Sequence, residues 1–148
     1  MIQPWIIFSV LSALAYFVHD LVLKQVSSKV DSVLAATILN FSAFSSLFLY
    51  SVFIQANTWR KFSWLSIESG LIFGAGICLA MATVFFVNIF SNGGNLSLAI
   101  PLVYVLIIFL GVIFGVMLYK ESLNIGQYLG VLLIIVGIIL ITRQTSAV

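Results

Sequence analysis

The segment SGLIFGAGICLAMATVFFVNIFSNGGNLSLAIPLVYVLIIFLGVIFGVMLY (residues 69–119) decides the fold, because it contains no charged residue. A helix needs about 20 apolar residues to cross the hydrocarbon core of a bilayer, so this segment is too long for one crossing. The polar sequence SNGGNLS (residues 91–97) interrupts it, and Asn-Gly-Gly is typical of a turn that ends a helix. The segment therefore predicts two consecutive membrane-spanning helices.

The rest of the chain contains three more apolar segments. Of its 148 residues, 63% are hydrophobic and 7% are charged. This is more apolar surface than one soluble domain of this size could bury, so lipid must be the solvent, and every segment in lipid should be helical to satisfy its backbone hydrogen bonds. We expect one all-α integral membrane domain over residues 1–148, with transmembrane helices at residues 5–23, 33–53, 69–90, 96–118 and 125–142.

Composition and motifs argue against a soluble enzyme. The net charge of +2 is small, and no zinc-ligand spacing, Gly-rich phosphate loop or nucleophile elbow is present. We therefore expect no enzyme activity, no cofactor, no metal site and no nucleic-acid partner. The single cysteine, Cys78, excludes an intrachain disulfide. The first apolar segment lacks the basic start and the cleavage site of a signal peptide, so it is predicted to be a retained span.

The basic residues are divided equally between the two sides of the predicted topology. Short cytoplasmic loops usually carry an excess of lysine and arginine. One side carries Arg60, Lys61 and Lys120, and the other carries Lys24, Lys29 and Arg143. Either another signal selects one orientation, or the chain inserts both ways. In the second case two oppositely oriented copies could pair like the inverted repeats of secondary transporters.

The first predicted helix carries a line of polar side chains on one face. Residues three and four positions apart share a helix face, and this line contains Ser12, Tyr16, Asp20 and Lys24, with His19 at its edge. Asp20 lies on the order of 8 Å from the middle of the span, inside a hydrocarbon half-thickness of roughly 15 Å. An ionised carboxylate at this depth is costly unless it is paired or hydrated, which favours a bundle interior or a water-filled cavity.

Two alternatives remain open for this line. The helix could enter the headgroups earlier, so that Lys24 reaches the surface along its apolar stem and Asp20 is hydrated at the boundary. His19 could relay protons, since histidine is the side chain that changes charge near physiological pH, or it could be a hydrogen-bonded structural group.

The other predicted helices carry weaker signals. Asn40 and Asn88 have side chains near mid-span that both donate and accept hydrogen bonds, and they could bind a substrate or join two helices. Pairs of glycines four residues apart allow helices to approach closely. These pairs are Gly70 and Gly74, Gly111 and Gly115, and Gly126 and Gly130.

The sequence LSLAIPLVYVLIIFLGVIFGVMLYKESLNIGQYLGVLLIIVGIILI (residues 96–141) resembles the end of an EamA domain, the five-helix unit of the drug/metabolite transporter superfamily. The features that carry the resemblance are an early proline, small residues in mid-helix, a glutamate before a short Leu-containing turn, and a last helix that contains glycine. In this chain they are Pro101, Gly111, Gly115, Glu121, Leu123, Gly130 and Gly137.

The resemblance implies a half of an inverted-repeat transporter. Most members are similar to two such units in one chain, with a central cavity built mainly from the first four helices of each unit. Carried over, this places Tyr16, Asp20, Asn88, Pro101 and Tyr104 toward a cavity. This chain has one unit, so a complete pathway would need a second copy, and it lacks the mid-membrane glutamate of the related four-helix multidrug exporters.

These observations lead to one expected function and two alternatives. We expect a secondary transporter of a small metabolite or drug-like solute that works by alternating access, as a homodimer that is antiparallel if the topology is dual. The alternatives are a flippase for a lipid-linked sugar or lipid headgroup, and a non-transporting membrane partner subunit. The expected location is the plasma membrane of a bacterium or archaeon, in contact with lipid.

Overall fold

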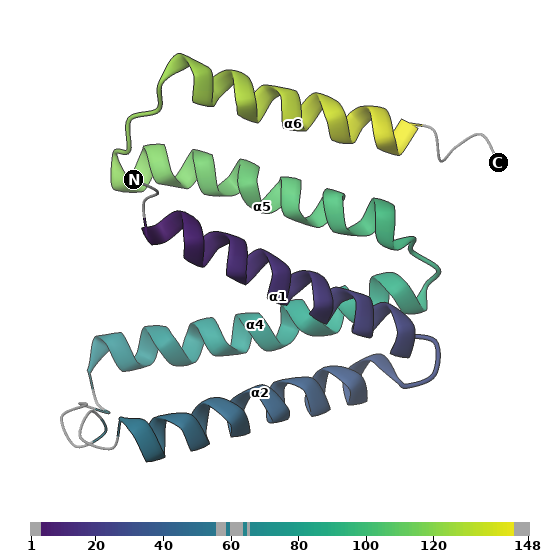
Figure 1. Cartoon of the computed structure of the whole chain (residues 1–148), viewed down its shortest axis with the longest axis vertical. Helices are drawn as coiled ribbons and strands as arrows, with labels where there is room; N and C mark the ends of the chain where they lie inside the picture. Colours follow the sequence, from purple (N-terminus) through teal and green to yellow (C-terminus); the bar gives the residue numbers. More distant parts are fainter. Residues whose placement is uncertain (1–3, 56–58, 60–63, 65, 144–148) are drawn as a thin grey trace. The chain divides into compact units, whose positions relative to one another are not determined.

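The computed structural model describes residues 4–55, 59, 64 and 66–143, and the regular structure within them is helical throughout. Its helices are α1 (Pro4–Val26), α2 (Ser32–Ile54), α4 (Ile67–Ser91), α5 (Leu96–Tyr119) and α6 (Ile125–Arg143), labelled as in Figure 1. All five are long and apolar enough to cross a membrane, and each predicted span lies inside one of them. The predicted all-α membrane fold is therefore confirmed. Arg60 and Lys61, which enter the topology prediction, lie outside the described residues.

The break predicted within the charge-free segment is confirmed. α4 ends at Ser91 and α5 begins at Leu96. Between them, Gly93 has a φ of +87°, a backbone conformation that glycine adopts without steric cost. Asn92 caps α4, because its backbone N–H and its side-chain amide both donate to the carbonyl of Asn88, the latter at 2.8 Å. The turn chemistry of residues 91–97 thus separates the two spans.

Side chains also cap the starts of helices. The carboxylate of Asp31 accepts hydrogen bonds from the backbone N–H groups of Val33 and Leu34, at 2.9 and 3.1 Å. At the start of α6, the Asn124 side chain accepts from the N–H of Gln127 at 2.9 Å, and the Gln127 side chain accepts from the N–H of Asn124 at 2.7 Å. Both arrangements satisfy N–H groups that have no partner inside the helix.

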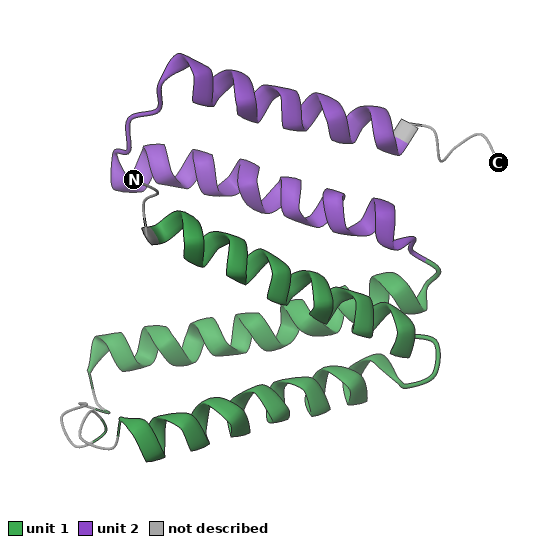
Figure 2. Cartoon of the chain, in the orientation of Figure 1, with its two compact units in different colours: residues 1–93 green, residues 94–148 purple. Residues whose placement is uncertain are grey.

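The chain divides into two compact units (Figure 2). Unit 1 comprises residues 1–93 and unit 2 residues 94–148. In unit 1, α4 packs along α2, and α1 makes a smaller contact with α4. In unit 2, α5 and α6 pack against each other as a helical hairpin. The polar face of the first helix therefore belongs to the same unit as α2 and α4.

Gly115 in α5 lies beneath the side chain of Glu121. The backbone N–H groups of Lys120 and Glu121 both donate to the carbonyl of Gly115, and Lys120 adopts a left-handed conformation with a φ of 54°. The Glu121 carboxylate then folds back, so that one oxygen lies 2.8 Å from the position that a Cβ on Gly115 would occupy. A Cβ at this position would force the end of the flexible Glu121 side chain to shift.

The other glycines of the predicted packing pairs have different surroundings. A Cβ on Gly70, Gly74, Gly111 or Gly130 would meet no atom within 4 Å, and one on Gly126 would meet the side-chain oxygen of Asn124 at 3.3 Å. The faces of these glycines have open space in this chain. Close packing of these pairs against another helix remains a prediction.

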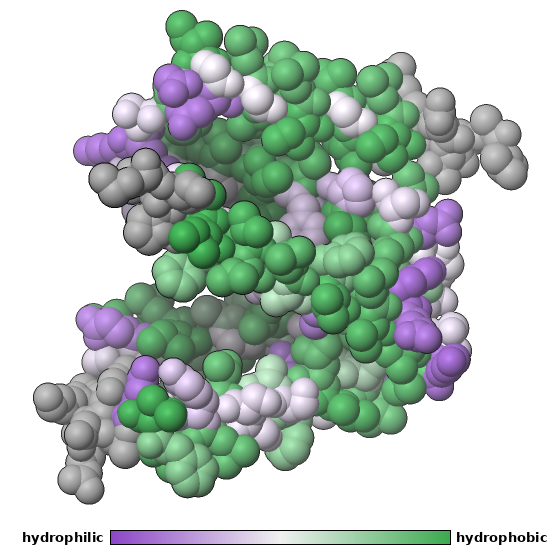
Figure 3. Space-filling view, in the orientation of Figure 1, coloured by the Kyte–Doolittle hydropathy of each residue, from purple (hydrophilic) through white to green (hydrophobic). Residues whose placement is uncertain are grey.

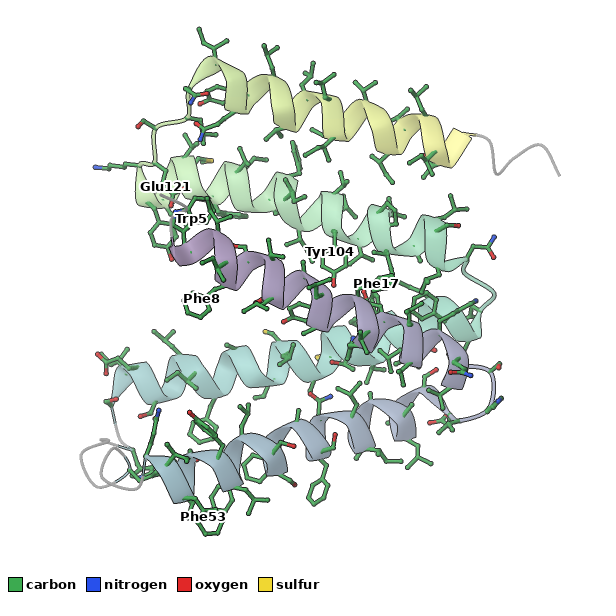
Figure 4. All side chains as sticks on the ribbon, viewed as in Figure 1. Trp5, Phe8, Phe17, Phe53, Tyr104 and Glu121 are labelled. Atoms are coloured by element: carbon green, nitrogen blue, oxygen red, sulfur yellow. The ribbon has the colours of Figure 1, made fainter. Side chains whose placement is uncertain are left out.

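The surfaces of the helices are apolar, as a lipid solvent requires. Large hydrophobic side chains are exposed on every helix, and Figure 3 shows them along the helices, with hydrophilic residues gathered near the helix ends. Phe53, which is 80% exposed, points away from α4 in Figure 4. Near the end of α2, aromatic rings contact one another from Phe48 to Trp59 and from Trp59 to Trp64. Such a cluster suits the headgroup level, where amphipathic rings are favoured.

The Asp31 cap predicts a measurable contribution to stability. Asp31→Ala removes the acceptor for two backbone N–H groups, so it should lower the free energy of unfolding by about 1 kcal/mol. Asp31→Asn keeps an acceptor oxygen and should retain most of the stability. Thermal unfolding of the purified chain in detergent, followed by circular dichroism, measures both variants. Equal losses in the two variants would contradict this role of the acceptor.

Candidate functional site

The polar face of α1 is uncovered along its first half and covered near its end. Ser12 and Tyr16 are exposed. Further along the same face, Asp20 and Leu23 are 2% and 4% exposed, and Ser27, just beyond the helix, is 4% exposed. α1 crosses α4 near this end and diverges from it toward its own N-terminus (Figure 1), and Figure 3 shows the surface hollowed between the first half of α1 and the α2–α4 pair.

Asp20 lies within the apolar span of α1. The apolar span of α1 runs from Trp5 to Val26, so Asp20 lies about 7 Å from its middle at 1.5 Å per residue. A buried carboxylate at this depth requires polar partners, because an unpaired charge in a low-dielectric medium is costly. Asp20 is 2% exposed within this chain, and its depth in the bilayer remains a prediction.

His19 supplies one of these partners. Its Nδ1 atom lies 2.9 Å from Oδ1 of Asp20, and the imidazole side chain is 33% exposed, whereas that of Asp20 is 3% exposed. Tyr16, one turn earlier, contacts the imidazole edge to face, with ring centroids 6.3 Å apart. The contacts therefore run from an exposed tyrosine through a partly exposed histidine to a buried carboxylate.

Lys24 lies one turn beyond Asp20 and contacts an aromatic ring of α4. Its Nζ atom lies 5.4 Å from the centroid of Phe90, within the range of a cation–π interaction. Phe90 is 3% exposed and is contacted edge to face by Phe86, at 5.2 Å between centroids. The ammonium group of Lys24 thus lies over the face of a buried ring, at the point where α1 meets α4.

Serine side chains form hydrogen bonds at the same end of unit 1. The side chains of Ser32 at the start of α2 and Ser91 at the end of α4 are hydrogen-bonded at 3.0 Å, although the two residues are far apart in the sequence. Ser32 is 8% exposed. Ser27 donates its hydroxyl to the carbonyl of Lys24 at 3.0 Å. The first hydrogen bond joins the start of α2 to the end of α4, and the second satisfies a carbonyl in the last turn of α1.

The two asparagines bind their own helices. The side-chain amide of Asn40 donates to the carbonyl of Ala36 at 2.8 Å, and that of Asn88 donates to the carbonyl of Val84 at 2.9 Å. Both residues are half-buried. Each amide group therefore has one donor engaged within its own helix, and a substrate contact by either residue remains a prediction.

The remaining predicted cavity residues belong to unit 2. Pro101 is the sixth residue of α5, and Tyr104 follows one turn later; both are half-buried. A cavity that joins them to Tyr16, Asp20 and Asn88 therefore remains a prediction. Within the residues that the structure describes, no three His, Cys, Asp or Glu side chains lie together so that they could hold a metal ion.

The sequence did not indicate Phe86, Phe90, Ser32 or Ser91 as members of this site. A phenylalanine in an apolar span is common. The pattern of hydrophobic residues along α4 does not indicate which face of this helix meets α1. The only available signal was that Phe86 and Phe90 are four residues apart and approach the end of a span at the level of Lys24.

The contact between His19 and Asp20 predicts a distinct tautomer. When neutral, His19 should carry its proton on Nδ1, because the carboxylate oxygen accepts a hydrogen bond from that atom. His19 is the only histidine in the chain, so ¹⁵N nuclear magnetic resonance of histidine-labelled protein in lipid nanodiscs reports this residue alone. Asp20→Ala should shift the population toward the Nε2–H tautomer. An Nε2–H tautomer in the unmodified chain would disprove the assignment.

Comparisons with known proteins extend these observations to a family. The model of the EamA-like transporter family matches residues 3–143, which is nearly the whole chain. No curated protein and no solved structure matches the chain. The proteins of this family are membrane transporters of small solutes and not enzymes. With five apolar helices in contact with lipid, the chain is an integral membrane protein that belongs to the EamA-like transporter family.

Proposed function

We propose that the chain is a secondary transporter of a small solute that works by alternating access, with the polar face of α1 as part of the solute pathway. The observation that carries the proposal is the change in exposure along this face, from the exposed Ser12 and Tyr16 to Asp20 at 2%. A polar face that is open toward one membrane surface and covered toward the other is what an intermediate of alternating access requires. The family match supports the class of function.

The covered end has contacts that could be exchanged during transport. The contact of Lys24 with Phe90 joins α1 to α4 at this end, and the Ser32–Ser91 hydrogen bond joins α2 to α4. A cation–π contact contributes on the order of 1–2 kcal/mol when the ring is desolvated. A movement of α1 relative to α4 would therefore exchange the Lys24–Phe90 contact, whereas the Ser32–Ser91 hydrogen bond and the long α2–α4 contact stay intact.

We further propose that the working unit is a homodimer whose two copies lie antiparallel in the membrane. The equal division of basic residues, three on each predicted side, supports it because such a chain has no strong topological preference. A second, inverted copy supplies the other half of an inverted-repeat pathway. The two Asp20 carboxylates would then lie on the order of 15 Å apart along the membrane normal, each nearer to a different surface.

A transport assay with a matched control tests the role of Asp20. Purified chain is reconstituted into vesicles loaded with a mixture of small metabolites, and the solutes that appear outside are identified by mass spectrometry. Asp20→Asn should reduce the rate at least tenfold relative to the unmodified chain, because it removes the buried charge of the pathway. Asp31→Asn makes the same chemical change at the exposed cap of α2 and should leave the rate unchanged.

The outcomes separate the proposed function from its alternatives. Equal rates for Asp20→Asn and the unmodified chain, or equal release from loaded vesicles with and without protein, would contradict transport along this face. Movement of a fluorescent lipid headgroup between leaflets, with no release of soluble metabolites, would instead indicate a flippase.

The antiparallel homodimer predicts two membrane orientations. Reporters of cytoplasmic and external location, fused after Val148, should both be active in comparable amounts. Two additional lysines in the turn between α1 and α2, beside Lys29, should shift the distribution strongly toward the orientation that keeps this turn in the cytoplasm. A reporter active on only one side in the unmodified chain would exclude the antiparallel homodimer and leave a parallel dimer or another partner.

A further inference from the structure

The side-chain ammonium group of Lys24 lies against the ring of Phe90, one turn along α1 from the buried carboxylate of Asp20. The Nζ atom of Lys24 lies 5.4 Å from the centroid of Phe90, whose ring is 3% exposed and is supported by the edge of Phe86. A cation over a desolvated ring is attracted by the negative charge of the ring face. The face of the Phe90 ring is therefore suited to bind an ammonium group.

The carboxylate of Asp20 lies one turn away on the same face of α1. Four residues along a helix correspond to about 6 Å, and Asp20 is 2% exposed. The His19 ring is in direct contact with this carboxylate at 2.9 Å, and the Tyr16 ring packs against that of His19. A buried carboxylate with aromatic side chains close by favours a cation over a neutral molecule of the same shape and disfavours an anion, because a cation is attracted both by the negative charge and by the ring faces.

We propose that the cluster formed by Tyr16, Asp20, Phe86 and Phe90 is a binding site for an organic ammonium group of the transported solute, and that Lys24 occupies it when no solute is bound. The proposal rests on the proposed transport function and narrows its solute to amines and quaternary ammonium compounds. The exposed first half of the polar face, with Ser12 and Tyr16, provides the approach.

The displacement of Lys24 links solute binding to opening. An ammonium group at Asp20 brings a second positive charge to within several ångströms of Lys24, and like charges repel strongly where water is scarce. The long flexible stem of lysine lets the side chain move toward the end of α1, since Lys24 lies in the last turn of this helix. When Lys24 leaves Phe90, the contact that closes this end of the α1–α4 pair is lost.

Binding of choline and 3,3-dimethylbutan-1-ol tests the proposal. The two molecules have nearly the same shape, but only choline carries a positive charge. Choline should raise the unfolding temperature of the full chain in detergent, since a ligand of the folded state stabilises it. It should also shift the ¹⁵N signals of His19, the only histidine. The neutral alcohol should do neither, and equal effects of the two molecules would overturn the proposal.

Variants of the two lysines distinguish competition from general charge effects. Lys24→Met keeps an apolar stem and removes the internal competitor, so it should tighten choline binding about tenfold, which corresponds to about 1.4 kcal/mol. Lys29→Met removes an exposed charge from the turn between α1 and α2 and should leave the affinity unchanged. Weaker binding in Lys24→Met, or the same tightening in both variants, would contradict the role assigned to Lys24.

Phe90→Leu and Asp20→Asn test the two attractive parts of the site. Made in the Lys24→Met background, each should weaken choline binding at least tenfold. Size-exclusion chromatography and circular dichroism establish that each variant is folded, and Phe90→Tyr, which keeps an aromatic face, should restore most of the affinity lost in Phe90→Leu. Unchanged affinity in both Phe90→Leu and Asp20→Asn would overturn the assignment of the site.

Failure of this proposal is distinguishable from failure of the proposed function. If the vesicles release neutral or anionic metabolites in an Asp20-dependent manner but choline does not bind, transport stands and the ammonium site is wrong. If choline binds as described but no solute crosses the membrane, the site stands and the transport function fails.

Discussion

The burial of one carboxylate within the apolar span of α1 is the constraint on which the rest of unit 1 depends. Asp20 cannot face lipid as an ion at acceptable cost, so α1 must turn this side toward other protein groups. The ends of α1, α2 and α4 meet there, held by the contact of Lys24 with Phe90 and by the hydrogen bond between Ser32 and Ser91. The polar face, the closed end and the proposed pathway all follow from the placement of this one side chain.

The hydrophobic effect places these helices in the membrane but does little to hold them to one another. Side chains such as Leu14 and Phe73 are more than half exposed, and lipid tails solvate them as well as a protein core would. Association in lipid depends instead on close packing and on polar contacts such as the Ser32–Ser91 hydrogen bond and the Lys24–Phe90 contact, which both involve the end of α4. These two contacts lie away from the first half of α1, where that helix diverges from α4.

The sequence was sufficient for the five long apolar helices, because the thickness of a bilayer imposes a length on every apolar segment. It was also sufficient for the polar line of α1, since the helical period alone puts Tyr16 and Asp20 on one face. It could not identify Phe90 or Ser91 as neighbours of that line. Which face of α4 meets α1 depends on contacts between distant segments, and the glycine spacing of α4 pointed to Gly70 and Gly74, where the chain leaves open space.

Because the Glu121 side chain folds back over Gly115, a substitution at one of these positions affects what the other position tolerates. Any side chain at position 115 would collide with a carboxylate oxygen only 2.8 Å away, and the cheapest response is for that carboxylate to swing outward. The two positions are thus energetically coupled, and the effects of altering both will not equal the sum of the separate effects. Libraries that diversify the α5–α6 hairpin should vary these two positions jointly, because a profile of single substitutions would misjudge what the pair allows.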